Sequence, residues 1–261
     1  MEESPPEEPK VVHKAPSPFG TVFVVDEGDE RTLRFDHPDG NRQSAMLKSN
    51  PRAVLSSYVR VATAGLAFTE GRSRALVVGL GGGAFPLLLH RCLPRTVVDV
   101  VEINPVVVDV AQRFFGVRET ERFHITVEDG AEFMAREGPS YDFIFLDAFS
   151  DKGIPDHLKK LAFFEDVLRR LSPGGAVVLN IALGIRERKK RLRDTFIQVF
   201  EECARLRGPS DSANLLLVGT PGPLPSEPVF RQQLWKLARE LRFPELTRSV
   251  AKFEPHPTGP L

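Results

Sequence analysis

A glycine-rich turn between an apolar strand and a helix constrains the fold of this chain more than any other feature. The predicted strand spans residues 74–78 and the predicted helix spans residues 84–92, and the turn between them contains Gly79, Gly81, Gly82 and Gly83. Glycine lets the backbone turn sharply and lets a ligand approach the main chain closely. The pattern therefore predicts a nucleotide-binding strand–turn–helix unit, and a tight turn that binds no ligand is the alternative.

The alternation of strand and helix continues along the chain. Further apolar strands are predicted at residues 96–101, 123–127, 141–146, 176–181 and 214–218. Helices are predicted at residues 105–115, from residue 131, and at residues 157–171, 188–206 and 232–241. Strands that are apolar throughout and alternate with helices are typical of a parallel sheet covered on both faces. We therefore expect an α/β fold with a Rossmann-like, doubly wound sheet.

The N-terminal part of the chain has a different pattern. Residues 1–18 are rich in Pro, Glu and Lys, which predicts a disordered tail. Residues 19–50 contain short β-rich segments separated by turns at Gly28 and Gly40, which predicts a small domain made of an antiparallel β meander. A helix is expected from Pro51 to about Phe68. The main domain is then predicted over residues 51–253, with a disordered tail at 254–261.

Charge and cysteine content limit the expected partners and location. The chain has 261 residues, with 35 Lys and Arg against 35 Asp and Glu. Proteins that bind nucleic acid through phosphate contacts usually carry a basic excess, so nucleic acid is not an expected partner. Cys92 and Cys203 lie in predicted helices and are interpreted as buried, reduced thiols, which fits the cytoplasm. We find neither a signal-peptide pattern nor an apolar run long enough to cross a membrane.

Three weaker features remain. Residues 186–193 include six basic side chains, interpreted as the solvated start of a helix, with docking of an acidic protein or nucleic-acid substrate as the alternative. Trp235 is expected to pack within the last helix. The histidines show no metal-ligand spacing, so no metal site is expected.

Carboxylates follow the successive strands. Glu102 stands at the end of the second strand, where it can accept hydrogen bonds from both ribose hydroxyls of a nucleotide. Asp129, with Gly130 and the N–H of Ala131, follows the third strand and is expected to hold adenine, and Asp147 ends the fourth strand. Because ligands of open α/β sheets bind where the strands end, these groups are expected to share one crevice. The turn also satisfies the dinucleotide fingerprint of NAD enzymes, but these acids suit a nucleoside with a cationic sulfonium better than a pyrophosphate.

The ordered succession of these motifs resembles the spermidine synthase (polyamine aminopropyltransferase) superfamily. The matching segments are residues 78–83, 101–105, 128–130, 141–147, 154–158 and 171–180, within a resemblance that covers roughly residues 43–182. The resemblance implies a seven-stranded sheet like that of S-adenosylmethionine (SAM) methyltransferases, preceded by a small β domain. It also implies a possible homodimer.

The resemblance assigns roles to individual residues. Asp147 is the implied catalytic residue, which deprotonates an amine nucleophile, although it could instead only bind the amino group of the cofactor. Gln43, Tyr58 and Asp151 are implied to bind the acceptor. The implied cofactor-binding residues are Gly79, Gly81, Gly82, Gly83, Glu102, Ile103, Asp129, Gly130, Ala131 and Asp147.

Local departures from the family pattern favour methyl transfer. Where spermidine synthases have Asp-Gly after the glycine turn, this chain has Ala84 and Phe85, and the Glu of their Tyr-His-Glu motif is replaced by Arg60. A polyamine carries several ammonium groups that need carboxylates, so these changes weaken the polyamine hypothesis. The Gly81–Leu87 region is also similar to the C-terminal domain of elongation factor 1A methyltransferases. We therefore expect methyl transfer from SAM to an amine of a small molecule or protein, with aminopropyl transfer from decarboxylated SAM and a non-catalytic nucleoside-binding module as alternatives.

Overall fold

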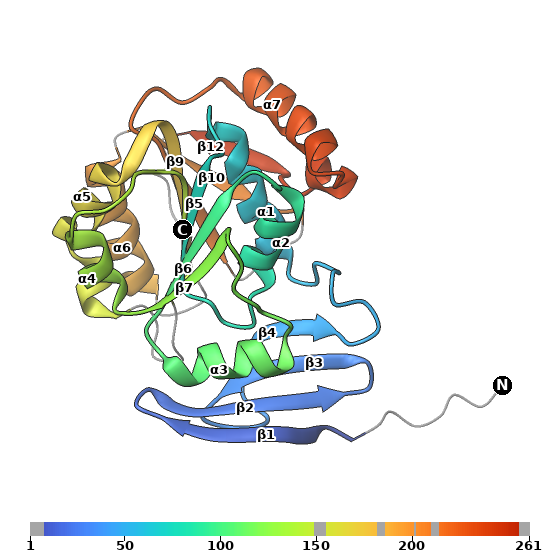
Figure 1. The fold of residues 1–261 in the computed structure, drawn as a ribbon. Helices are drawn as coiled ribbons and strands as arrows, with labels where there is room; N and C mark the ends of the chain where they lie inside the picture. The colour runs from blue at the N-terminus through green and yellow to red at the C-terminus, as the bar shows by residue number, and fades with distance from the viewer. Residues whose placement is uncertain (1–7, 149–154, 182–185, 201, 210–213, 256–261) are drawn as a thin grey trace.

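The computed structural model of the chain describes residues 8–148, 155–181, 186–200, 202–209 and 214–255, and it contains two sheets (Figure 1). The larger sheet has eight strands in the order β12-β10-β11-β9-β8-β5-β6-β7. Its parallel part consists of β5 (Arg74–Val78), β6 (Val97–Glu102), β7 (Phe123–Val127), β8 (Tyr141–Leu146) and β9 (Leu171–Ile181). The antiparallel part consists of β11 (Leu215–Gly219), β10 (Cys203–Arg207) and β12 (Lys252–Pro255). The α/β prediction is confirmed, with one strand more than the seven expected.

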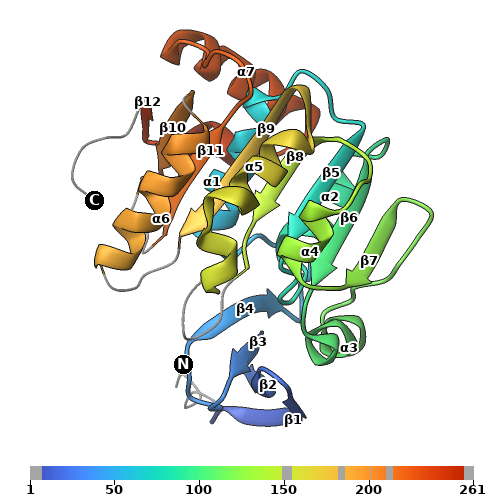
Figure 2. The same cartoon turned by 90° about the vertical axis from the view of Figure 1, so that its left-hand side faces the viewer.

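Helices cover both faces of this sheet (Figure 2). One face carries α4 (Gly130–Ala135), α5 (Leu161–Arg169) and α6 (Arg186–Val199), and the other carries α1 (Ser57–Ala64), α2 (Ala84–Cys92) and α7 (Glu227–Glu240). Short 3₁₀ turns lie at Gly65–Phe68, Asp156–Lys159 and Pro244–Arg248. Alternate residues of β8 serve the two faces, since Phe143 and Phe145 join one core and Ile144 and Leu146 join the other.

The smaller sheet is an antiparallel meander that lies beside α3 (Pro105–Phe114). It consists of β1 (Lys10–Ser17), β2 (Gly20–Glu27), β3 (Glu30–Phe35) and β4 (Arg42–Leu47). The meander is as predicted, but the tail predicted over residues 1–18 is wrong for Lys10–Ser17. This polar segment forms an edge strand because β2 supplies its hydrogen-bond partners and its half-buried residues pack on α3.

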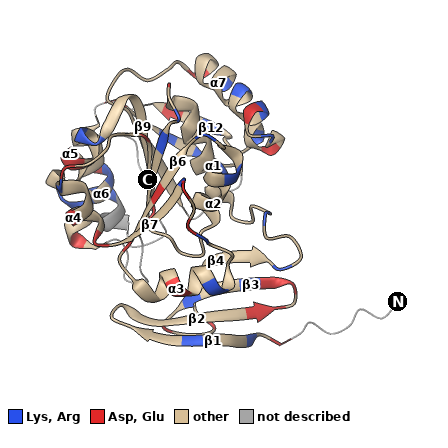
Figure 3. Cartoon of the chain, viewed as in Figure 1, with Lys and Arg blue, Asp and Glu red and all other residues tan. Residues whose placement is uncertain are grey.

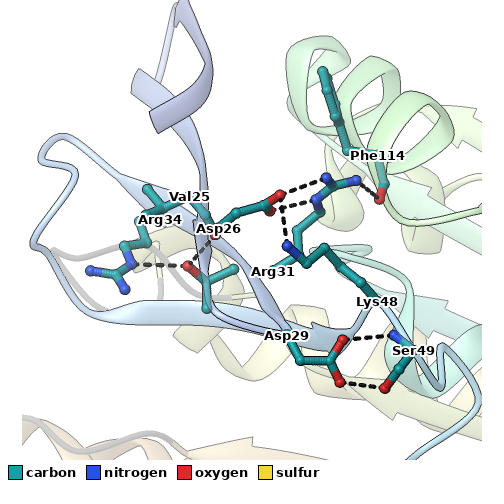
Figure 4. Close-up of polar contacts among 9 residues, drawn as sticks. Val25, Asp26, Asp29, Arg31, Arg34, Lys48, Ser49 and Phe114 are labelled. Carbon is teal, nitrogen blue, oxygen red and sulfur yellow. Dashed lines mark hydrogen bonds and ion pairs between the residues drawn. The ribbon is translucent and has the colours of Figure 1, made fainter. Parts of the chain in front are cut away.

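Polar side chains fix the meander to the end of α3 (Figure 4). The Arg31 guanidinium binds both carboxylate oxygens of Asp26, at 2.7 and 2.9 Å, and donates to the Phe114 carbonyl at 3.2 Å. Lys48, the residue just after β4, donates a hydrogen bond to the Asp26 carboxylate. The Asp29 carboxylate accepts hydrogen bonds from the backbone N–H and the hydroxyl of Ser49. These contacts tie the β2–β3 turn to the segment just after β4 and to the end of α3, so they fix the meander against the larger domain.

The C-terminal part differs from the prediction in three places. The helix expected over residues 188–206 ends at Val199, because the buried Cys203, Ala204 and Leu206 pair as β10 between β11 and β12. The tail expected from residue 254 is wrong for the first two residues, which belong to β12. Trp235 does not pack in the core: it is 54% exposed, with the Arg239 guanidinium 4.9 Å from its ring centre.

Charged side chains are distributed over both domains (Figure 3). In the part of the chain that the structure describes, no helix is long and apolar enough to cross a membrane, and no group of three His, Cys, Asp or Glu side chains could hold a metal ion.

Candidate functional site

The predicted site lies at the edge of the sheet where the parallel strands end. The Gly79 N–H donates to the Val101 carbonyl of β6, and the Asp147 N–H donates to the Val78 carbonyl of β5, both at 2.8 Å. Gly79 has φ +103°, and a Cβ there would lie 2.4 Å from the Asp147 carbonyl oxygen. The glycine turn therefore leaves β5 between Glu102 on one side and Asp147 on the other, so the structure brings these predicted site residues to adjacent strand ends.

Glu102 is bound into the main chain around the turn. Its carboxylate accepts from the Leu80 N–H at 2.8 Å and from the Asn104 N–H at 2.9 Å. Burial raises its pKa, and the backbone donors oppose that rise. The backbone N–H groups of Gly81 and Ile103 also act on this carboxylate, so a ribose would have to share its oxygens with main-chain donors. The neighbouring Ile103 is 38% exposed and so offers an apolar surface beside that carboxylate.

The outer side of the glycine turn contacts protein. The Gly82 N–H donates to the Ser44 hydroxyl of β4 at 2.8 Å, and a Cβ on Gly81 would lie 2.7 Å from that oxygen. A Cβ on Gly82 would meet Phe115 at 3.0 Å, and one on Gly83 would meet Val117 at 2.5 Å. Because these three glycines lack a Cβ, the meander and the segment after α3 can pack directly against the turn. Sequence reasoning missed Ser44, although its half-buried neighbour Gln43 was assigned to the acceptor site.

Asp129 caps a helix. Its carboxylate accepts from the N–H of Ala131 at 2.8 Å and lies 2.8 Å from His157 Nε2. A Cβ on Gly130 would lie 2.7 Å from Val78, so that glycine allows α4 to pack on β5. The Ala131 N–H that was predicted to bind adenine is therefore engaged by Asp129 in this structure.

A small apolar hollow lies beside the strand ends. Its volume is about 10 Å³, comparable to a single water molecule. An adenine ring is far larger, so this hollow cannot hold a nucleoside. The hollow is lined by Val78, Leu146, Ala148, Leu158, Phe163, Leu179 and Asn180.

Asp147 is the centre of a hydrogen-bonded network from three elements. The Tyr58 hydroxyl of α1 donates to Oδ2 at 3.2 Å, and the Asn180 amide of β9 donates to Oδ1 at 2.6 Å. Asn214, just before β11, donates in turn to Oδ1 of Asn180 at 2.8 Å. Burial raises the pKa of Asp147 to about 7, against the lowering effect of Asn180 and Tyr58. Burial and the Asp147 charge together hold the pKa of Tyr58 well above its ordinary value.

A carboxyl with a pKa near neutrality can take up a proton from an amine and release it again at physiological pH. Its position beside the glycine turn puts this exchange next to the predicted nucleoside. Asp151, the third residue assigned to the acceptor, lies outside the described residues. The Arg60 guanidinium donates to the Val54 carbonyl at 2.5 Å, within the segment that leads into α1.

The sequence profile of the spermine/spermidine synthase domain matches residues 51–192. The chain belongs to this family. It is 30% identical over 237 residues to the polyamine aminopropyltransferase of Vibrio vulnificus, covering 89% of this chain and 79% of that protein. It is also similar to a crystal structure of a spermidine synthase in complex with the transition-state analogue AdoDATO, with a TM-score of 0.73 and 16% identity over 93% of this chain and 85% of that one.

Membership of the spermine/spermidine synthase family corrects the expected reaction. The human eEF1A lysine and N-terminal methyltransferase is 32% identical over 127 residues, which cover only 43% of this chain and 18% of that protein. The similarity to aminopropyltransferases extends over most of the chain, so the preference for methyl transfer is wrong. It gave too much weight to Ala84 and Arg60, whereas Tyr58 and Asp147 keep a mutual hydrogen bond. The coarser expectation, a transferase with a SAM-methyltransferase-like fold, is confirmed.

Proposed function

We propose that this protein transfers the aminopropyl group of decarboxylated SAM to an amine of a small polyamine acceptor. The observation that carries the proposal is the Asp147 carboxyl, with a pKa raised to about 7, hydrogen-bonded to Tyr58 and Asn180 at the end of β8. The names of the relatives support the same reaction.

The donor chemistry fits the charges around the crevice. Decarboxylated SAM supplies a sulfonium whose adjacent methylene carbon is open to attack and whose leaving group is neutral methylthioadenosine. The carboxylates of Glu102 and Asp147 flank the turn, and both favour a cationic ligand over an anionic one. Exposed Ile103 offers an apolar contact for the base. Ala84 gives the donor's own amine no carboxylate, so we expect donor affinity to be modest.

Asp147 acts on the acceptor. An acceptor amine arrives as an ammonium and has to lose a proton before its lone pair can attack. Ionised Asp147 accepts that proton, the nitrogen forms a bond to the methylene carbon, and the carbon–sulfur bond breaks with its electrons going to sulfur. The product amine keeps the aminopropyl group, and the proton leaves through the carboxyl. Tyr58 holds Oδ2 of Asp147 and thereby orients the base.

The experiment is a product assay on the full chain. We expect purified protein with decarboxylated SAM and putrescine to release methylthioadenosine and form spermidine in equal amounts, measured by chromatography. Asp147→Asn should lower turnover by about 10²- to 10⁴-fold while retaining methylthioadenosine binding in calorimetry. Methylated products from SAM, or no methylthioadenosine with any diamine, would contradict the proposal.

We also propose that the protein is cytoplasmic and forms a homodimer. A cytoplasmic location and a homodimer are both compatible with the proposed reaction. Light scattering coupled to gel filtration tests the dimer directly, and a mass of one chain would rule it out.

A further inference from the structure

We propose that Asn214 is a positioning residue: it sets the orientation of the Asn180 side-chain amide and so keeps a hydrogen-bond donor on Asp147. The inference rests on the proposed function for its kinetic consequence only. The structural relationship can be measured without turnover.

The side-chain amides of Asn214 and Asn180 form a continuous series of hydrogen bonds that ends at Asp147. Asn214 Nδ2 donates to Asn180 Oδ1 at 2.8 Å, and Asn180 Nδ2 donates to Asp147 Oδ1 at 2.6 Å. Asn180 is 2% exposed, so its amide is sheltered from water that could replace either partner. Each group in the series therefore depends on its neighbour.

The sheet geometry brings the two amides together. β9 pairs antiparallel with β11, and Asn180 stands opposite Leu216 in the register. Asn214 lies two residues before Leu216, on the same side of the sheet, as a diagonal cross-strand neighbour of Asn180. The contact is built into the pairing of the two strands.

The chemistry of an amide makes the orientation matter. An Asn side chain has an oxygen that only accepts and an NH₂ that only donates. With Asn214 donating to its oxygen, Asn180 turns its NH₂ toward Asp147. The reversed amide would put its oxygen against the carboxylate and its NH₂ against the Asn214 NH₂, which are two repulsive contacts. In its observed orientation Asn214 therefore reinforces the orientation of Asn180 that favours ionised Asp147.

The groups that act on Asp147 are few in the part of the chain that the structure describes. Tyr58 faces it from α1 and Asn180 faces it from β9, and both lower a pKa that burial raises to about 7. Glu102 lies across β5 on the other side of the turn. Loss of the Asn180 donor is therefore expected to raise the pKa of Asp147 further, because burial would be opposed by Tyr58 alone.

Two variants test the orientation in different ways. Asn214→Leu removes the donor to Asn180, and Asn214→Asp replaces it with an acceptor that attracts the Asn180 NH₂ away from Asp147. A rise of about one pH unit would take the ionised fraction at pH 7 from about a half to about a tenth, a loss of about fivefold in kcat/KM that disappears above about pH 9. Asn214→Asp should shift the profile at least as far. Leu217→Val is the matched control, since it loosens the same strand while its side chain lies on the face of the sheet away from the amides.

The independent measurement is the titration of the Asp147 carboxyl by ¹³C NMR, with its signal identified by its loss in Asp147→Asn. We expect the titration midpoint of Asp147 to move to higher pH in both Asn214 variants and to remain unchanged in Leu217→Val. Unchanged midpoints in folded Asn214 variants would overturn the inference. An enzyme that forms no spermidine but shows these shifts would refute the proposed function and leave the positioning role standing.

Discussion

The Tyr58 hydroxyl donates to Oδ2 of Asp147 at 3.2 Å, although 89 positions separate the two residues in the sequence. The bond stabilises the ionised carboxylate, so Tyr58→Phe should raise the pKa of the base. In the proposed reaction the ionised form of Asp147 is the active one, so the acid limb of kcat/KM should move to higher pH. We expect a loss of about three- to tenfold at pH 7 that shrinks in alkaline buffer.

The only other tyrosine provides the control. Tyr141 begins β8 at the opposite end from Asp147, so Tyr141→Phe should leave the pH profile of kcat/KM in place. A parallel shift in both variants would mean that the effect on Asp147 is not specific to Tyr58.

The raised pKa of Asp147 also predicts a dependence of stability on pH. Its folded-state pKa of about 7 lies above the ordinary value of 3.8, so between these values the folded state binds more protons than the unfolded state. Stability should then fall as pH rises through this window, by about 2–4 kcal/mol. Asp147→Asn stays neutral, and urea unfolding should find it more stable than the wild type at pH 8 but not near pH 4. If Asp147→Asn and the wild type differed in stability by the same amount at both pH values, the predicted direction of the pH dependence would be wrong.

Ser44 is expected to support donor binding. Ser44→Ala removes the acceptor of the Gly82 N–H, which costs about 1 kcal/mol when a buried donor is left without a partner. We expect the dissociation constant of methylthioadenosine in calorimetry to rise about three- to tenfold, with kcat little changed. Ser140→Ala, in an exposed loop, is the control for the loss of a hydroxyl. Undiminished affinity in Ser44→Ala would show that the turn holds its shape without β4.

Arg31 is expected to matter for stability more than a surface arginine of the same sheet. Its ion pair with Asp26 is sheltered, with side chains 22% and 15% exposed, and it also caps the α3 carbonyl of Phe114. Arg31→Gln should lower the free energy of unfolding in urea by about 1–3 kcal/mol. Arg42 pairs with Glu30 but is 51% exposed, so Arg42→Gln should cost less than about 0.5 kcal/mol. Equal losses of unfolding free energy in Arg31→Gln and Arg42→Gln would mean that the contact of Arg31 with α3 adds no stability.

Much of the fold could be predicted because buried parallel strands are apolar throughout. The β5 to β9 series follows that rule, and the antiparallel β2–β4 meander was predictable from short β-rich segments separated by turns. The missed strands break it: β1 is an edge strand that contains two Lys and a Pro, and β10 alternates buried Ala204 and Leu206 with Arg205 and Arg207, which face Glu254 on β12. Local pattern cannot distinguish such strands from a tail or a helix end, since their partners lie elsewhere in the chain.

Some residues of the candidate site could likewise be predicted from the sequence, and others could not. Glu102 and Asp147 were predictable because the ends of adjacent parallel strands must meet at one edge. Ser44 and Asn214 were not, since each contacts the site through the pairing of a strand that is distant in sequence. The reaction was misjudged because single replacements such as Arg60 carry no information about where their side chains point.

β11 runs opposite to β9, so the chain enters β11 at the edge where the parallel strands finish. Asp147 accordingly has neighbours from both halves of the polypeptide: Tyr58 and the glycine turn come from the first half, and Asn180 and Asn214 come from the second. Replacement of Asn214 at the entrance to β11 can thus retune the ionisation of Asp147 while the glycine turn and Glu102 stay unchanged, a modular arrangement that suits both divergence and engineering.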